Sequence, residues 1–247
     1  ALMTGQRELA VKQINAMVAS LPDEFVRAFA PMIEGFGAMP DEVMVRFGMW
    51  DPILAAPQPD KEYMPYTNAF HHGARAIAFA ASDKTADARA EQAMWLEGIK
   101  KIPEGEVFHN NPMPAICSLA SAMIEGEILV REGKTDDGLA KLREAVKLED
   151  ALHYDEPPAW MMPARHALGA ALMKAGKPAE AEQVYRDDLK KLPNNGWSLY
   201  GLADSLGKQG KAAEARAVDA RFKEVWSKAD IQITSSCLCQ AGVTMAK

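Results

Sequence analysis

The chain has 247 residues, of which 48% are hydrophobic and 25% are charged, and its formal net charge is -6. This composition is that of a globular chain long enough to bury a sizeable core. Mild acidity argues against nucleic acid as the main partner, because phosphate binding needs clustered lysine and arginine. No membrane insertion is expected either, because no apolar run reaches the roughly 18 residues of a membrane span.

The first residues fit the second half of a two-helix repeat unit. Residues 1–22 place Gly5, Ala10, Ile14 and Pro22 at the late positions of the pattern that recurs further along the chain. We therefore expect the chain to open inside a repeat, with further repeats upstream of its first residue.

Residues 23–57 predict two helices that depart from this repeat. The first covers the segment DEFVRAFAPMIEGF. The second covers PDEVMVRFGMWDPILAAPQP, with Pro40 near its first turn and Asp41 on the favourable N-terminal side. Pro57 ends the second helix.

The remaining helices are predicted as repeated pairs. A weaker copy of the pattern spans about 68–102, with Asp83 at the position of the usual glycine, and a clearer copy spans about 119–150. After the loop that contains YDEPP, two consecutive copies 34 residues apart occupy 162–195 and 196–229. A period of 34 with apolar or small residues at fixed positions is that of tetratricopeptide (TPR) repeats.

These patterns predict an all-α chain with a TPR-type α-solenoid, which is a right-handed superhelix of antiparallel helix pairs. One domain is expected over residues 1–229, followed by a tail over residues 230–247. The alternation in ADIQITSS, at the start of this tail, is the single period-2 pattern, and this segment could extend as a short strand or lie irregularly.

Several segments resemble a group of long bacterial TPR proteins. They are YDEPPAW (Tyr154–Trp160), LGAAL (Leu168–Leu172), NGWSLYGL (Asn195–Leu202) and, upstream, RFGMWDPIL (Arg46–Leu54). The resemblance covers most of the chain and implies an α-solenoid that corresponds to the C-terminal half of a longer protein. That group has no generally established activity, so the resemblance implies no active site.

In a TPR superhelix the first helix of each pair lines the concave face, which gives a predicted partner-binding groove. Its residues are Met123, Arg131, His166, Met173, Lys174, Trp197, Tyr200, Asp204 and Lys208. Aromatic, methionine and basic side chains are typical of a surface that binds an extended segment, and the basic ones would favour an acidic peptide. In the alternative interpretation, the aromatic residues pack between repeats and the basic residues are only solvated.

The tail contains Cys237 and Cys239, a C-x-C pair whose soft thiolates suit Cu(I). If the tail folds back onto the helices, His166 and His153 are candidate additional ligands. Two alternatives stay open: a flexible tail with incidental thiols, or a disulfide within the tail or to Cys117, which lies in an apolar stretch and is expected to be buried.

Two functional hypotheses follow. The first is a non-catalytic scaffold that binds a protein or peptide partner in its concave groove. The second is a metal-binding solenoid, for Cu(I) above other ions, although no cofactor is certain. Motifs of phosphate loops, zinc proteases and serine hydrolases are not found, which disfavours an enzyme. Copper binding would favour a bacterial periplasmic or secreted location.

Overall fold

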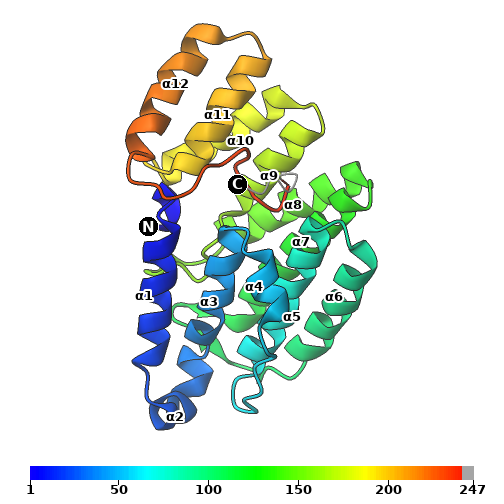
Figure 1. Ribbon diagram of the computed structural model, residues 1–247. Coiled ribbons are helices and arrows are strands. Elements are labelled where there is room, and N and C mark those ends of the chain that lie inside the picture. Colours follow the sequence, from blue (N-terminus) through cyan, green and yellow to red (C-terminus); the bar gives the residue numbers. More distant parts are fainter. Residues whose placement is uncertain (241–247) are drawn as a thin grey trace.

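The computed structural model describes residues 1–240 (Figure 1). Within this range the chain forms twelve α-helices, one short 3-10 helix and one small hairpin. The elements are η1 (Leu2–Thr4), α1 (Arg7–Ala19), α2 (Asp23–Ile33), α3 (Gly35–Arg46), α4 (Trp50–Ala55), α5 (Pro65–Ala81), α6 (Thr85–Ile99), β1 (Val107–Phe108), β2 (Asn111–Pro112), α7 (Met113–Arg131), α8 (Thr135–Asp150), α9 (Ala164–Lys174), α10 (Pro178–Lys191), α11 (Gly196–Lys208) and α12 (Ala212–Val225). The all-α prediction is confirmed. Residues 241–247 of the predicted tail lie outside the described residues.

Helices α5 to α12 are joined in pairs by four turns of one design. Each turn has one residue with positive φ, and the backbone N–H of the lysine that follows donates to the carbonyl oxygen five residues earlier, at 2.9 to 3.0 Å. The positive-φ residues are Asp83, Gly133, Gly176 and Gly210, and the lysines are Lys84, Lys134, Lys177 and Lys211. This hydrogen bond closes a Schellman motif, which satisfies a carbonyl at the end of the first helix. Asp83 therefore occupies the glycine position, as the repeat pattern predicts.

Small residues allow the last helices to approach closely. Tyr185 of α10 is buried between Gly169 of α9 and Gly201 of α11. A methyl group at Gly169 would lie 2.3 Å from the Tyr185 ring, and one at Gly201 would lie 2.2 Å from it. Both distances are far below van der Waals contact, so the ring packs flat against helix backbone on two sides.

The N-terminal helices differ from the prediction in their boundaries. Pro40 lies in the second turn of α3 rather than near a helix start, because α3 already begins at Gly35. The reason is tertiary. The Glu34 carboxylate accepts hydrogen bonds from the backbone N–H groups of Tyr66 and Thr67, which fixes the α2–α3 junction against the start of α5. The helix therefore begins at the residue after this junction, although proline favours the first turn of a helix.

A hairpin forms where the sequence predicts no strand. The segment ADIQITSS lies irregularly, which is one of its two predicted alternatives. Val107 pairs with Pro112 and Phe108 with Asn111 in the antiparallel hairpin before α7. The Asp155 carboxylate in the loop between α8 and α9 accepts from the Asn110 backbone N–H at 3.0 Å, so that loop braces the hairpin turn.

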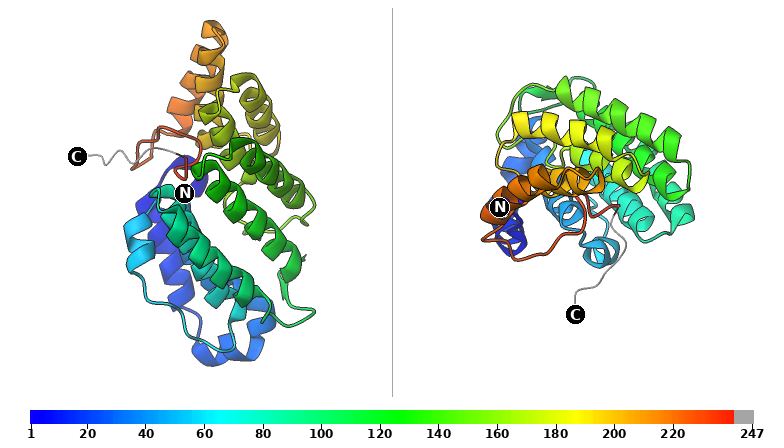
Figure 2. Two further views of the ribbon diagram at one scale, coloured as in Figure 1. Left: turned by 90° about the vertical axis from the view of Figure 1, so that its right-hand side faces the viewer. Right: turned by 90° about the horizontal axis from the view of Figure 1, so that it is seen from above.

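The start of the chain meets α11 and the segment that follows α12. The Asp230 carboxylate accepts from the backbone N–H groups of Arg7 and Glu8, both at 2.8 Å, and so caps the start of α1. The Trp197 indole of α11 donates to the Leu2 carbonyl at 2.8 Å. From this junction the segment 230–240, called the folded tail below, runs along the inner side of the curved array of helices (Figures 1 and 2).

One helix departs from the expectation that no segment is apolar enough to span a membrane. The helix α7 is 19 residues long and has a mean hydropathy of 1.5 over an 18-residue window. Of that window, 72% is buried inside the protein. Cys117, on this helix, is buried as predicted. A mostly buried core helix passes the same test of length and composition as a membrane span, and α7 occupies the centre of the core.

Candidate functional site

The folded tail is bound on the inner face through specific polar contacts. The Ser236 hydroxyl donates to the His166 carbonyl at 2.8 Å and lies 2.7 Å from the Tyr185 hydroxyl. Ile233 is buried upstream of this anchor. The tail therefore folds back onto α9 and α10, which differs from the alternative of a flexible tail with incidental thiols.

Three predicted groove residues lie beneath the surface. Met123, His166 and Trp197 are all buried. The Trp197 ring packs edge-on against Trp226 at 5.3 Å between centroids, and the Arg46 guanidinium lies 3.7 Å above it. For Trp197 the structure thus follows the alternative in which the aromatic side chain packs inside the array.

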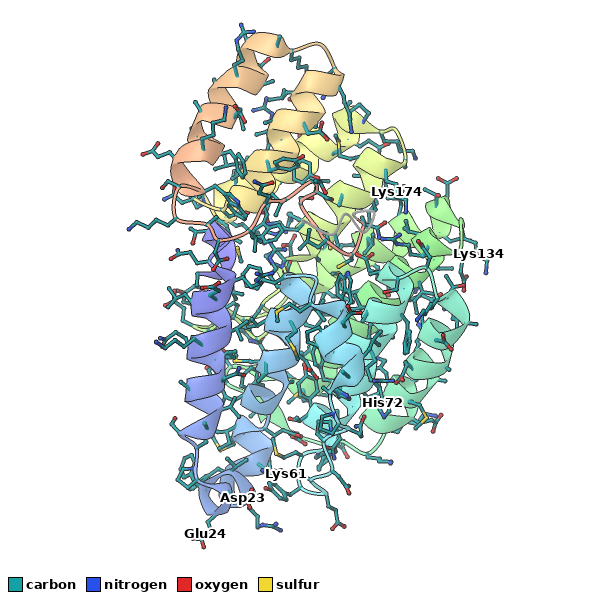
Figure 3. All side chains as sticks on the ribbon, in the orientation of Figure 1. Asp23, Glu24, Lys61, His72, Lys134 and Lys174 are labelled. Carbon is teal, nitrogen blue, oxygen red and sulfur yellow. The ribbon has the colours of Figure 1, made fainter. Side chains whose placement is uncertain are left out.

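The other predicted groove residues, apart from Arg131, gather around one cavity of about 220 Å³. It is lined by Met173, Lys174, Tyr200, Asp204 and Lys208 on the helices and by Thr234, Ser235, Ser236 and Gln240 on the folded tail. Lys174 lies at the end of α9 (Figure 3). Burial and the nearby Arg131 lower the pKa of the Lys174 ammonium. Lys208 forms an ion pair with Asp204 at 3.1 Å.

Arg131, the remaining predicted groove residue, contacts the folded tail directly. Its guanidinium donates to the Cys239 carbonyl at 2.5 Å and pairs with the Asp83 carboxylate at 3.0 Å. A basic residue predicted to hold an acidic partner thus holds a backbone carbonyl of its own chain.

Each ring nitrogen of His166 is hydrogen-bonded to a charged side chain. Its Nδ1 lies 2.9 Å from Arg46 Nη2, and its Nε2 lies 2.8 Å from an Asp188 carboxylate oxygen. Because arginine only donates, Nδ1 must accept and Nε2 must carry the proton. Burial, together with Arg46, lowers the pKa of His166, which fits this neutral form. The Asp188 carboxylate also accepts from the Ser198 hydroxyl at 2.7 Å.

The two tail thiols meet a buried carboxylate of α7. Cys237 Sγ lies 3.9 Å from Glu127 Oε1, and the ligand atoms of Cys237, Cys239 and Glu127 all lie within 4.8 Å of one another. The other Glu127 oxygen accepts from the Gln240 amide. Burial raises the pKa of Glu127 to about 7. The Cys237 sulfur and burial raise the pKa of Cys239 well above its usual value.

The predicted metal ligands therefore separate into two groups. Cys237 and Cys239 come together, whereas His153 stays exposed in the loop after α8, where its backbone N–H donates to the Asn111 side chain at 2.8 Å. His166 lines the same small cavity as the thiols, but both of its ring nitrogens are occupied. All three cysteines are free, so neither disulfide alternative is present.

Sequence reasoning missed the charged residues that surround the thiols. Glu127 lies at an inward position of the repeat register, and an acidic residue there is the one signal that would have found it. Arg46 lies outside the repeats, so no periodic pattern points to its burial. Burial lowers the pKa of Arg46 to about 10, although Cys237, Cys239 and Asp188 oppose that shift.

Comparisons with protein-family models, with curated proteins and with solved structures find no match to this chain. The resemblance to TPR proteins therefore rests on residue patterns, and no relative supplies a ligand or an activity.

Proposed function

We propose that this chain is a TPR-type helical-repeat scaffold whose concave face binds an extended segment of a protein partner, without catalysis. The observation that carries the proposal is the folded tail. It is a non-helical segment bound along the inner side of the array, held by the Ser236 hydroxyl, by Ile233 and by the Cys239 carbonyl. A face that binds one extended segment has the hydrogen-bonding groups to bind another.

The four matching turns support the repeat class. Each reproduces one positive-φ residue and one 6→1 hydrogen bond, although the sequence around them varies. Stacked helix pairs joined in this way are the unit of α-solenoids, which use their concave surfaces for binding.

The state of His166 supports a role without catalysis. A Cys–His–Asp arrangement is suggested by the closeness of Cys237, His166 and Asp188. However, Nδ1 of His166 accepts from Arg46 and Nε2 is bonded to Asp188, so neither nitrogen is available to take a proton from a thiol.

The cavity beside the tail suggests which chemistry a partner would offer. Small hydroxyl side chains, Thr234, Ser235 and Ser236, form its tail wall. Lys174 forms no ion pair within residues 1–240, and its exposed side chain lines the cavity, so its ammonium group is accessible to a partner. We therefore expect a partner with an extended, serine- or threonine-rich stretch and a carboxylate that reaches Lys174.

The test uses a fluorescein-labelled peptide with the sequence of residues 230–240, in which serine replaces both cysteines. Fluorescence anisotropy compares its binding to the native chain and to an Ile233→Ala/Ser236→Ala variant, whose own tail is loosened. Because the native tail competes within the same molecule, the variant should bind the peptide at least about tenfold more tightly.

A scrambled peptide and far-UV circular dichroism serve as controls. Adding Lys174→Glu to the loosened variant should weaken binding of the peptide again. If the folded variant binds the tail peptide no better than the scrambled one, the concave face is not a peptide-binding surface.

A further inference from the structure

Two thiols from the tail converge with a carboxylate from α7 inside the protein. Cys237 Sγ, Cys239 Sγ and an oxygen of Glu127 lie within 4.8 Å of one another, and all three side chains are buried. For metal–thiolate bonds of about 2.3 Å, two sulfurs on one ion lie at most about 4.6 Å apart. The thiols can therefore reach one ion with side-chain shifts of a few tenths of an ångström.

The space beside the thiols is small, and two further sulfur-containing side chains line it. The cavity beside them has a volume of only about 10 Å³, and Met123 and Met162 also line it. Such a space is at the lower limit for one water molecule. It favours an ion of low coordination number with sulfur ligands over an ion that keeps bound water, such as a tetrahedral zinc ion with an open position.

A buried cation lines the same cavity as the thiols, where it would stabilise thiolates. The Arg46 guanidinium is 4% exposed, and within residues 1–240 its Nε has no hydrogen-bond partner. One Nη2 bond reaches neutral His166. A buried guanidinium needs an anion nearby. Asp188 is one such anion, and ionised Cys237 and Cys239 would also stabilise the Arg46 charge.

The number of ligands then favours Cu(I). Two thiolates are enough for a soft ion of low coordination number, and Arg46, which lines the same cavity, offsets part of their charge. A tetrahedral divalent ion such as zinc would need the Glu127 carboxylate as a third ligand. We propose that Cys237 and Cys239 form a buried two-thiolate site for Cu(I), beside Arg46 and with Glu127 as a neighbour that is not required as a charged ligand.

Binding is an exchange of ions without a redox step. Each thiol that coordinates the ion loses its proton to solvent, and copper enters and stays as Cu(I) under reducing conditions. The proposal does not rest on peptide binding by the concave face, so either one can fail alone.

The experiment uses the full chain, reduced and free of oxygen, and loads it with Cu(I) supplied as its acetonitrile complex. After desalting, elemental mass spectrometry should give one copper per chain. Titration against a coloured Cu(I) chelator should then show at least about 100-fold weaker binding for Cys237→Ser/Cys239→Ser. Cys117→Ser, which removes the buried thiol of α7, is the matched control and should keep the native affinity.

Glu127→Gln distinguishes the two kinds of ion. It should keep Cu(I) binding within about threefold, whereas a tetrahedral divalent site would lose its third ligand. X-ray absorption at the copper edge provides a readout independent of affinity, and it should show sulfur neighbours that disappear in the double serine variant. Equal copper in that folded variant and in the native chain would overturn the proposal. A one-to-one Zn(II) complex that Cu(I) does not displace would overturn it as well.

Discussion

The helix pairs and the folded tail are stabilised in different ways. In the pairs, the same contacts recur, such as the four Schellman turns and the stacking of Tyr185 between Gly169 and Gly201. In the tail, each contact occurs once: Asp230 caps α1, and Ser236 bonds α9. The repeated contacts hold the helices together in the curved array, whereas the single contacts hold the folded tail in its concave face.

The largest expected effect comes from breaking a repeated contact. Gly201→Val would push a branched side chain into the Tyr185 ring, which already lies 2.2 Å from the site of a methyl group. We expect a loss of about 3 kcal/mol in the free energy of unfolding, or a fall in Tm of about 6 to 12 °C. Thermal unfolding followed by circular dichroism measures this change.

Gly207 in the same helix provides the matched control. A methyl group at Gly207 meets nothing within 4 Å, so Gly207→Ala should raise stability by about 0.5 to 1 kcal/mol through helix propensity. An equal loss in both variants would show that close packing at Tyr185 is not the cause.

A smaller effect on the free energy of unfolding is expected from a contact that occurs once, outside the repeats. The buried Glu42 carboxylate accepts from the Met161 N–H at 3.1 Å, and burial raises the pKa of Glu42 to about 8, with Asp41 adding to the shift. The folded state therefore holds a proton that the unfolded state releases near pH 4.5. This contribution to stability is complete below about pH 4.5 and is lost as the pH rises to about 8.

Glu42→Gln should remove this pH dependence while its amide oxygen still accepts the Met161 bond. At pH 8 the variant should be more stable than the native chain, and near pH 5 the difference should shrink. Urea unfolding across this pH range provides the measurement, with the exposed Glu24→Gln as control. An unchanged slope of stability against pH would show that Glu42 is not protonated in the folded state.

The smallest effect is expected from the cap that joins the two ends of the described chain. Asp230→Ala leaves the first N–H groups of α1 without their partner, which typically costs about 1 kcal/mol. Hydrogen exchange should increase at Arg7 and Glu8 and along the folded tail, whereas the α9–α10 turn should keep its protection. Asp219→Ala, which removes an exposed ion pair with Lys223, should change neither region.

The all-α class and the turns within the helix pairs were predictable from the sequence, because these turns repeat. The glycine positions of the helix turns, Asp83 among them, follow from the repeat pattern. The start of α3 at Gly35 did not, because the Glu34 carboxylate that fixes this junction bonds to residues more than 30 positions away. Local residue spacing cannot predict a hydrogen-bond partner that is so distant in the sequence.

The candidate site was predictable only in part. The C-x-C pair is visible in the sequence, and its thiols do come together with a potential ligand. The prediction that His153 and His166 are additional metal ligands rested on residue type alone. His153 lies in a different loop, and His166 is bonded through both ring nitrogens to Arg46 and Asp188.

The position of the folded tail is the central claim, and thiol reactivity tests it most directly. A Cys117→Ser chain leaves Cys237 and Cys239 as the two reporters, each less than a tenth exposed. With a disulfide reagent such as DTNB, both thiols should react at least about 100-fold more slowly in the native chain than in urea. Reaction of both thiols at the rate of the unfolded chain would show that the tail does not lie in the concave face.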